Sequence, residues 1–204
     1  VSAHLQGLAE RIAQMEQQAQ DYREHLEEQR QKALIDPLTG LPNRAAWGER
    51  LQHEVEQWQN HGKPLLIAML DLDHFKHVND GYGHPMGDRV IKSLALFLKQ
   101  RLRKTDFIGR YGGEEFAIVM PDTDQESAHK VLNQIRQRFA EIHYPAQPVD
   151  LSCSFSAGVV QMHGDADSLL MASQADEALY RAKNNGRNQV HGFHQTRPIA
   201  TICS

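Results

Sequence analysis

The sequence predicts a mixed α and β domain that follows a long N-terminal helix. Three observations carry this prediction. Apolar side chains recur at alternating spacings of three and four over residues 5–33, residues 64–70 are nearly all apolar, and two glycines separate two strand-like runs within residues 106–120. The first pattern indicates a helix with one apolar seam, the second a buried strand and the third a β-hairpin.

The composition is that of an ordinary globular protein. The chain has 204 residues, of which 40% are hydrophobic and 24% charged, enough for one domain with a core and an accessory segment. A net charge of -4 and a pI near 6.3 argue against a broad basic surface, so we expect no nucleic-acid partner. Cys153 and Cys203 form neither a disulfide framework nor a metal-ligand pair, which fits a reducing compartment.

Membrane and targeting signals are missing from the sequence. No apolar run is long enough to cross a bilayer, and no signal peptide opens the chain. We therefore expect no membrane contact in this fragment and a cytoplasmic location. Because the first residue is Val1 and not Met, we expect a longer protein, whose upstream region would hold any sensor or membrane anchor.

The N-terminal helix is predicted to form a parallel coiled coil. Its seam occupies the a and d positions of about four heptads, and Arg11 at g and Glu16 at the following e would pair across the dimer. The narrow seam and very polar flanks favour this over a helix packed on its own domain, which stays as the alternative. The seam residues are Leu5, Leu8, Ile12, Met15, Ala19, Tyr22, Leu26, Gln29 and Ala33. Ala19, Tyr22 and Gln29 fill such positions poorly, so the dimer should be weak or adjustable.

A chain break follows this helix. The segment 36–44, with the sequence DPLTGLPNR, contains two prolines and a glycine, and Asn43 can cap the helix that we expect to run to about residue 60. We place the domain boundary here. Residues 1–35 are then a dimerisation and signalling helix, residues 36–194 a second domain and residues 195–204 a loose tail.

The apolar strand ends in two carboxylates. Asp71 and Asp73 are alternate residues and therefore share a face of the strand. A carboxylate at the end of a buried strand is rigidly placed and can hold a cation. For Asp73 we favour the simpler interpretation that it caps the following helix. Asp71 ends an apolar run without a turn residue, and so it is the stronger candidate for a cation ligand.

Two helices separated by a glycine-containing turn are predicted over residues 75–103. Asn79 lies near the end of the first helix, and Asp88 lies near the start of the second. An amide and a carboxylate together can recognise guanine, whose N1–H and N2–H₂ groups are two adjacent donors. Both side chains could instead be helix caps, and their spacing alone favours that interpretation.

The hairpin delivers two more carboxylates. Gly112 and Gly113 are expected to adopt positive φ in a tight turn, with Glu114 and Glu115 at its far edge. Two adjacent carboxylates at a rigid tip are unfavourable unless water or a cation meets them. A solvated acidic turn is the alternative.

The C-terminal half is predicted from periodicity. We expect a helix that ends near residue 143, a half-buried strand over 150–160 with Cys153 on its apolar side, a helix over 168–185 and an edge strand over 189–193. Lys183 and Arg187 stand four residues apart at the end of the last helix. The helix dipole alone explains cations there, but they could equally reach a triphosphate.

Five segments, in order, resemble the motifs of the GGDEF family of diguanylate cyclases, in the variant with Glu at the third position. They are DxLTGLxNR at 36–44, FKxxND at 75–80, GHxxGD at 83–88, GGEEF at 112–116 and AKxxGRN at 182–188. The resemblance covers about residues 36–188. It implies an α+β fold with a palm-like, mostly antiparallel central sheet wrapped by helices.

The resemblance also implies an activity. Two GTP molecules would be condensed into cyclic di-GMP and two pyrophosphates by a homodimer, joined through the coiled coil and facing catalytic domains. The implied catalytic residues are Asp71, Glu114 and Glu115, and the implied ligands of Mg²⁺, or of Mn²⁺, are Asp71, the carbonyl of Leu72 and Glu114. The implied substrate-binding residues are Phe75, Lys76, Asn79, Asp88, Lys183 and Arg187.

A second site is implied by the resemblance alone. Arg103 and Asp106 have the RxxD spacing of the family's inhibitory site for the product, although that spacing is commonplace on protein surfaces. The rival interpretations are a GGDEF module that binds nucleotide without turnover, a dimerisation module, and a cyclase with an altered choice of base.

Overall fold

The computed structural model describes residues 2–147 and 149–193, without the side chains of residues 2–5 and 9. The chain forms two compact units, residues 1–35 and residues 36–204. The expectations about Val1, the side chain of Leu5 and the tail 195–204 fall outside the described residues. Within the described part of the chain, no helix combines the length and the apolar character needed to cross a membrane.

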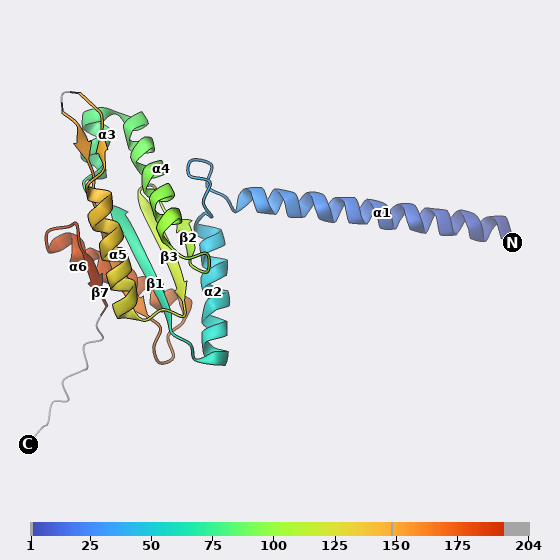
Figure 1. Ribbon diagram of the computed structural model, residues 1–204. Helices are drawn as coiled ribbons and strands as arrows, with labels where there is room; N and C mark the ends of the chain where they lie inside the picture. Colours follow the sequence, from blue (N-terminus) through green and yellow to red (C-terminus); the bar gives the residue numbers. More distant parts are fainter. Residues whose placement is uncertain (1, 148, 194–204) are drawn as a thin grey trace, which may run out of the picture. The chain divides into compact units, whose positions relative to one another are not determined.

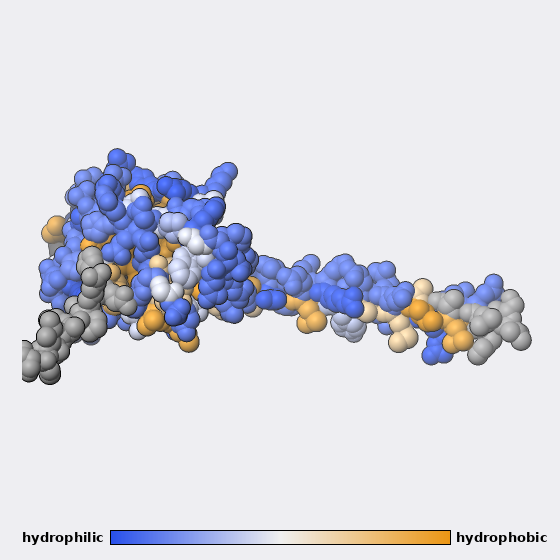
Figure 2. All heavy atoms as spheres, turned by 90° about the horizontal axis from the view of Figure 1, so that it is seen from below, coloured by the Kyte–Doolittle hydropathy of each residue, from blue (hydrophilic) through white to orange (hydrophobic). Residues whose placement is uncertain are grey.

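The first unit is one long helix, α1 (Ser2–Ala33), as predicted (Figure 1). Its apolar side chains gather along one side of the helix (Figure 2). Those exposed between 43% and 71% are Leu8, Ile12, Met15, Tyr22 and Leu26. Polar side chains elsewhere pair along the helix, as when Gln17 donates to Asp21 at 2.9 Å. The seam is therefore present and exposed in the single chain, while its pairing stays a prediction.

The second unit is built on a five-stranded sheet with the order β2-β3-β1-β6-β7. The central strand β1 (Leu65–Leu72) is buried along its whole length, as predicted. It pairs antiparallel with β3 (Glu115–Pro121) and β6 (Phe155–Gln161). The edge strand β2 (Phe107–Arg110) is antiparallel to β3, and the edge strand β7 (Val190–Gly192) is parallel to β6. The mostly antiparallel sheet is thus confirmed.

Helices cover both faces of this sheet (Figure 1). In β1, even-numbered side chains such as Leu66 pack in one layer and odd-numbered ones such as Ile67 in the other, because successive side chains of a strand point to opposite faces. The first layer contains α3 (Phe75–Tyr82), α4 (His84–Arg101) and α5 (Gln125–Ala140), and the second contains α2 (Arg44–His61) and α6 (Ser168–Asn184). These are the five helices that the sequence predicts for the described part of this unit.

The start of α2 follows the sequence closely. Asn43 is its N-cap, and the side-chain oxygen of Asn43 accepts hydrogen bonds from the backbone N–H groups of Ala45 and Ala46 at 3.0 and 3.1 Å. These two donors belong to the first turn, whose N–H groups have no acceptors inside the helix. The cap therefore fixes where α2 begins.

The predicted half-buried strand over residues 150–160 is wrong in two respects. The chain forms a short β5 (Leu151–Ser152), which pairs with β4 (His143–Tyr144), and then the separate β6. β6 is also buried on both faces, because a helical layer covers each side of the sheet, and Ser156 is fully buried. Cys153 is buried as predicted, and desolvation raises the pKa of its thiol to about 11.

Candidate nucleotide and metal site

A polar hollow of about 250 Å³ lies where β1 ends. Its walls come from the end of β1, the start of α3, the β2–β3 turn and the end of α6. The lining residues are Asp71, Leu72, Asp73, His74, Phe75, Lys76, His77, Glu114, Lys183 and Arg187. Seven of them are site residues named from the sequence, drawn from segments far apart in the chain. A hollow of about 330 Å³ at the other end of the sheet contains none of the named residues.

Asp71 is buried at this strand end, with 5% exposure. Its Oδ2 lies 2.7 Å from Nζ of Lys183, while its Oδ1 is buried with no hydrogen-bond partner among the described residues. Desolvation raises the pKa of Asp71 to about 6; the hydrogen bond and charge of Lys183 oppose this rise, and Glu114 and Glu115 add to it. A buried oxygen without a partner is costly, and a cation would remove that cost.

The register of the sheet places the segment that carries Glu114 and Glu115 beside Asp71. Glu115 is the partner of Asp71 across β1 and β3, and the N–H of Leu72 donates to the carbonyl of Glu114 at 3.3 Å. Across residues 2–147 and 149–193, no three His, Cys, Asp or Glu side chains form a metal-binding group. Two carboxylates and the carbonyl of Leu72 suit Mg²⁺, which prefers hard oxygens and keeps waters or substrate phosphates as its other ligands.

The turn between β2 and β3 differs from the predicted one. Neither Gly112 nor Gly113 has a positive φ, and the N–H groups of Tyr111 and Gly112 both donate to the carbonyl of Glu115, at 2.8 and 3.2 Å. Gly112 is needed for a different reason. A Cβ at this position would lie 2.2 Å from Oε2 of Glu115. Glycine is therefore needed at position 112 because a side chain there would collide with the carboxylate of Glu115, and not because the backbone conformation requires it.

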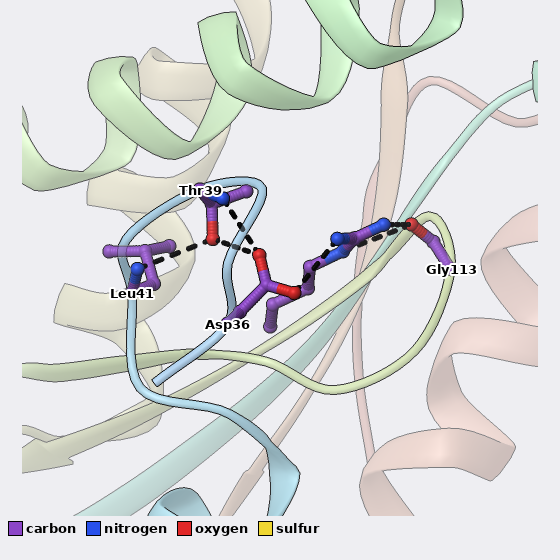
Figure 3. Close-up of polar contacts among 5 residues, drawn as sticks. Asp36, Thr39, Leu41 and Gly113 are labelled. Carbon is purple, nitrogen blue, oxygen red and sulfur yellow. Dashed lines mark hydrogen bonds and ion pairs between the residues drawn. The ribbon is translucent and has the colours of Figure 1, made fainter. Parts of the chain in front are cut away.

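Asp36 is tied to the same turn through Arg110 (Figure 3). Nη1 of Arg110 donates to Oδ1 of Asp36 at 2.9 Å, and Nη2 donates to the carbonyl of Gly113 at 2.7 Å. Burial would raise the pKa of Asp36, but hydrogen bonds from Thr39 and the charge of Arg110 hold it below its usual value. Sequence patterns assign no role to this pair, although Arg110 stands two positions before the first glycine of the turn.

The candidate base site lies between α3 and α4. A Cβ on Gly87 would lie 2.1 Å from Oδ1 of Asn79 and 3.0 Å from Cζ of Phe75, so this glycine keeps space open beside the amide. Oδ1 of Asn79 is buried and unpartnered within the described chain, and Asp88, next to Gly87, is exposed. The capping interpretation is wrong, because Gly83 is the cap at both the end of α3 and the start of α4.

Asp73 does not cap α3, contrary to the interpretation that we favoured. The N-cap is His74, whose φ of 55° is left-handed and whose side chain makes no capping hydrogen bond. Oδ1 of Asp73 accepts from Oγ of Ser156 at 2.7 Å, and Oδ2 accepts from Oγ of Ser154 at 2.7 Å and from the N–H of Asn188 at 2.9 Å. This carboxylate is therefore satisfied by distant parts of the chain.

Cationic side chains line the remaining wall of the hollow. Lys76 and Arg187 are exposed and Lys183 is partly buried. Because Lys183 contacts Asp71 directly, the helix dipole is not a sufficient explanation for its position. The rings of His74 and His77 stack beside Lys76, with centroids 5.6 Å apart. The wall thus offers positive charge and ring donors suited to phosphate oxygens.

Arg103 and Asp106 lie outside the hollow, in the turn between α4 and β2. Oδ2 of Asp106 accepts from the backbone N–H of Arg103 at 2.9 Å, and its Oδ1 is buried with no partner in the described part of the chain. Burial raises the pKa of Asp106, while the hydrogen bond and charge of Arg103 oppose that rise. Their spacing therefore serves a local turn, and a product-binding role stays a prediction.

The fold and the site define a palm-like α+β domain with a polar hollow, in which carboxylates lie at one edge and cationic side chains along the opposite wall. The GGDEF family, described as "Diguanylate cyclase, GGDEF domain", matches residues 33–189. The chain belongs to this family.

Known relatives agree with this assignment. Diguanylate cyclase DgcP of Pseudomonas aeruginosa is 47% identical over 192 residues, which are 93% of this chain but only 28% of that protein. The coiled coil and GGDEF domain of DgcB from Caulobacter crescentus, solved in complex with c-di-GMP, gives a TM-score of 0.80 at 31% identity, covering 91% of this chain and 98% of that one. The active GGEEF domain of a diguanylate cyclase from Vibrio cholerae gives 0.72 at 36% identity, covering 76% and 98%.

Proposed function

We propose that this chain is a diguanylate cyclase domain, which condenses two GTP molecules into cyclic di-GMP and two pyrophosphates. The observation that carries the proposal is the hollow in which Asp71, Glu114 and Leu72 meet Lys183 and Arg187. An acidic edge and a basic wall in one hollow match the opposite charges of a divalent cation and a triphosphate. The names of the relatives, and the c-di-GMP bound to one of them, support the same activity.

The proposed cation site consists of Asp71, Glu114 and the carbonyl of Leu72. The unpartnered Oδ1 of Asp71 supports this assignment, and the all-oxygen donor set suits Mg²⁺ or Mn²⁺. When bound, the cation would neutralise phosphate charge and stabilise the attacking and leaving oxygens. With a pKa of about 6, Asp71 is ionised at pH 8 and available to a cation.

Lys183 would have two partners in turn. Its ammonium neutralises Asp71 at 2.7 Å in the structure, and it would move to the β- and γ-phosphates once the cation matches the charge of Asp71. Its flexible four-carbon stem permits this exchange. Arg187 and Lys76 would brace the same phosphates. Neutralising them favours departure of pyrophosphate, since charge builds on the leaving group during phosphoryl transfer.

Base recognition would fall to Asn79 and Asp88. The carboxylate of Asp88 can accept from N1–H and N2–H₂ of guanine, and Asn79 holds a buried amide oxygen without a protein partner. Phe75 forms the apolar side of this space, next to Gly87. Adenine lacks the adjacent pair of donors, so it would leave these acceptors unpaired, which gives strong discrimination.

Two domains must cooperate in this reaction. Each would hold one GTP, and the 3′-hydroxyl of each would attack the α-phosphorus of the other across a two-fold axis. Glu115, opposite Asp71 in the register, is suited to orient that hydroxyl or the cation. The exposed seam of α1 fits a second copy of the chain, and pairing there would raise the effective concentration of the second domain.

Polar substitution of Leu8, Ile12 and Leu26 tests the dimer proposal. We expect turnover to become strongly dependent on protein concentration, because the two half-sites would meet only by collision. Analytical ultracentrifugation and rates at several concentrations measure this, with substitutions at Gln17 and Glu24 as controls. Unchanged turnover at low protein concentration would exclude a role for the seam.

Product feedback is proposed at Arg103 and Asp106. The guanidinium can donate in a bidentate way to a guanine edge or a phosphate of cyclic di-GMP, and the unpartnered Oδ1 of Asp106 can accept from the base. Arg103→Ala should weaken inhibition by added product and leave the initial rate nearly unchanged, whereas the neighbouring Lys104→Ala should change neither. The site has no such function if the unmodified chain is not inhibited by product.

The activity itself is tested by incubating the chain with GTP and Mg²⁺ and separating the products by chromatography. We expect cyclic di-GMP from the unmodified chain and from Glu141→Ala, an exposed carboxylate outside the hollow, and none from Glu114→Ala. An unmodified chain that binds GTP but forms no product would be a nucleotide-binding module instead. Full activity of Glu114→Ala would refute the cation assignment.

A further inference from the structure

Arg187, in the basic wall of the hollow, and the residue after it have a left-handed backbone. Arg187 has φ of 63° and Asn188 has φ of 47°, and neither is glycine. In this left-handed region the Cβ atom crowds the following carbonyl oxygen. Asparagine tolerates this conformation better than most residues, but arginine adopts it only where its surroundings hold it. The direction of the Arg187 side chain therefore depends on what holds residues 187 and 188.

The backbone of this segment is held by Asp73. Oδ2 of Asp73 accepts from the N–H of Asn188 at 2.9 Å, directly after Arg187 in the chain. The carboxylate is itself fixed from the other side by the hydroxyls of Ser154 and Ser156, each at 2.7 Å. With 5% exposure, Asp73 has little freedom to move. It joins the end of β1 to the loop after α6 through groups that cannot easily rearrange.

The side chain of Asn188 has a second support. Nη1 of Arg136, on α5, donates to Oδ1 of Asn188 at 2.6 Å. Arg136 is in turn oriented by Oδ1 of Asn133, which accepts from its Nε and Nη2 at 2.9 and 2.8 Å. Asp73 and Arg136 thus hold the backbone and the side chain of the same residue.

We infer that Asp73 is a positioning residue, which fixes Arg187 toward the phosphates of GTP by accepting the N–H of Asn188. The inference rests on the proposed function, since it takes Arg187 to be a phosphate ligand. Asp73 would act mainly through hydrogen bonds, because all three of its donors are neutral groups. Its charge also favours the charged form of Arg136 and raises the pKa of that guanidinium, against the larger effect of desolvation. A cation ligand such as Asp71 would instead need its charge.

Nucleotide affinity separates this role from a general structural one. The probes are a GTP analogue with a methylene bridge between the α- and β-phosphates, and GMP, both titrated calorimetrically in Mg²⁺. Asp73→Ala should bind the analogue about tenfold more weakly and GMP unchanged, because a lost hydrogen bond of this kind corresponds to about one decade in affinity. Asp73→Asn should bind both normally, since its amide can accept from Asn188 and Ser154 and donate to Ser156.

The variant Arg187→Ala is the background in which the effect of Asp73→Ala is tested. If Asp73 acts through Arg187, the double variant Asp73→Ala with Arg187→Ala binds the analogue no more weakly than Arg187→Ala alone. Arg136→Met, which leaves the strand end intact, should show a smaller loss of the same kind, about threefold for the analogue and none for GMP. This variant keeps the test open if Asp73→Ala does not fold.

Three results would overturn the inference: additive losses in the double variant, an equal loss of GMP affinity with Asp73→Ala, or an Asp73→Asn variant as weak as Asp73→Ala. Such results leave the proposed function standing as long as the unmodified chain binds the analogue and forms product. If the unmodified chain binds neither probe, the proposed function itself is wrong.

Discussion

Asp71 and Asp73 lie two residues apart at the end of β1, and each is 5% exposed, yet their surroundings differ. Asp73 accepts three hydrogen bonds, from Ser154, Ser156 and the backbone of Asn188. The carboxylate of Asp71 pairs with Lys183 through one oxygen, and its other oxygen is buried without a hydrogen-bond partner in the described chain. A buried carboxylate whose hydrogen bonds are satisfied by the protein supports the structure, whereas one with an unpartnered oxygen is available to a ligand.

The largest expected effect comes from removing the charge of each carboxylate in turn. Asp71→Asn should lower kcat by about a thousandfold or more, because an amide binds Mg²⁺ far more weakly and the phosphate charge stays unmatched. Asp73→Asn should stay within about threefold, since its hydrogen bonds persist. Rates of cyclic di-GMP formation at saturating Mg²⁺ measure both. Equal losses in the two variants would remove the contrast.

The substitution Asp71→Asn, which should lower activity, should raise stability. The pKa of Asp71 is raised from 3.8 to about 6, so the stability linked to its protonated form is complete below pH 3.8 and lost as the pH rises through about 6. At pH 8 with EDTA, Asp71→Asn should therefore be about 1–3 kcal/mol more stable to urea than the unmodified chain. The difference should vanish near pH 4, and a less stable variant at pH 8 would contradict the burial argument.

Lys183 tests the comparison further, because it forms the ion pair with the carboxylate of Asp71. Lys183→Met should raise the KM for GTP about tenfold through loss of a charged phosphate contact. The apparent affinity for Mg²⁺ should hold or improve, since Lys183 and the cation compete for Asp71. Lys130→Met on α5, which also breaks a pair with a carboxylate, is the matched control and should change neither constant. A parallel loss of Mg²⁺ affinity would show that no competition exists.

The smallest effect should come from the turn beside Asp71. Gly112→Ala places a Cβ 2.2 Å from Oε2 of Glu115, so this carboxylate must shift, and we expect kcat to fall about fivefold. Gly48→Ala on α2, where a Cβ meets nothing within 4 Å, should leave kcat unchanged. Kinetics and melting curves of both variants separate a local shift from a loss of stability. A Gly112→Ala enzyme with normal kcat would show that Glu115 adapts freely.

The sequence predicted the helices and strands better than the hydrogen-bond partners of individual side chains. Asp71 was recognisable because it ends an apolar run, and Glu114 because it sits at a hairpin tip, and the structure brings both to one hollow. Sequence patterns favour a capping role for Asp73 and a half-buried strand around Ser156, whereas both residues are buried and bonded to each other. Both errors have one cause: the hydrogen bond that joins them spans 83 residues, and local periodicity carries no information about such a partner.

The backbone geometry of the turn and the order of the strands could not be predicted from local sequence patterns, for related reasons. A pair of glycines predicts positive φ, but Gly112 is explained by the carboxylate of Glu115 that packs against it. The central position of β1 between β3 and β6 likewise depends on packing between segments, which strand periodicity does not specify.

The most direct test of the central claim is an anomalous difference map from crystals grown with Mn²⁺ and the methylene-bridged GTP analogue. We expect a manganese peak bound by carboxylate oxygens of Asp71 and Glu114 and by the carbonyl of Leu72, with Asp73 still bonded to Ser154, Ser156 and Asn188. A peak on Asp73, or none at Asp71, would contradict this expectation.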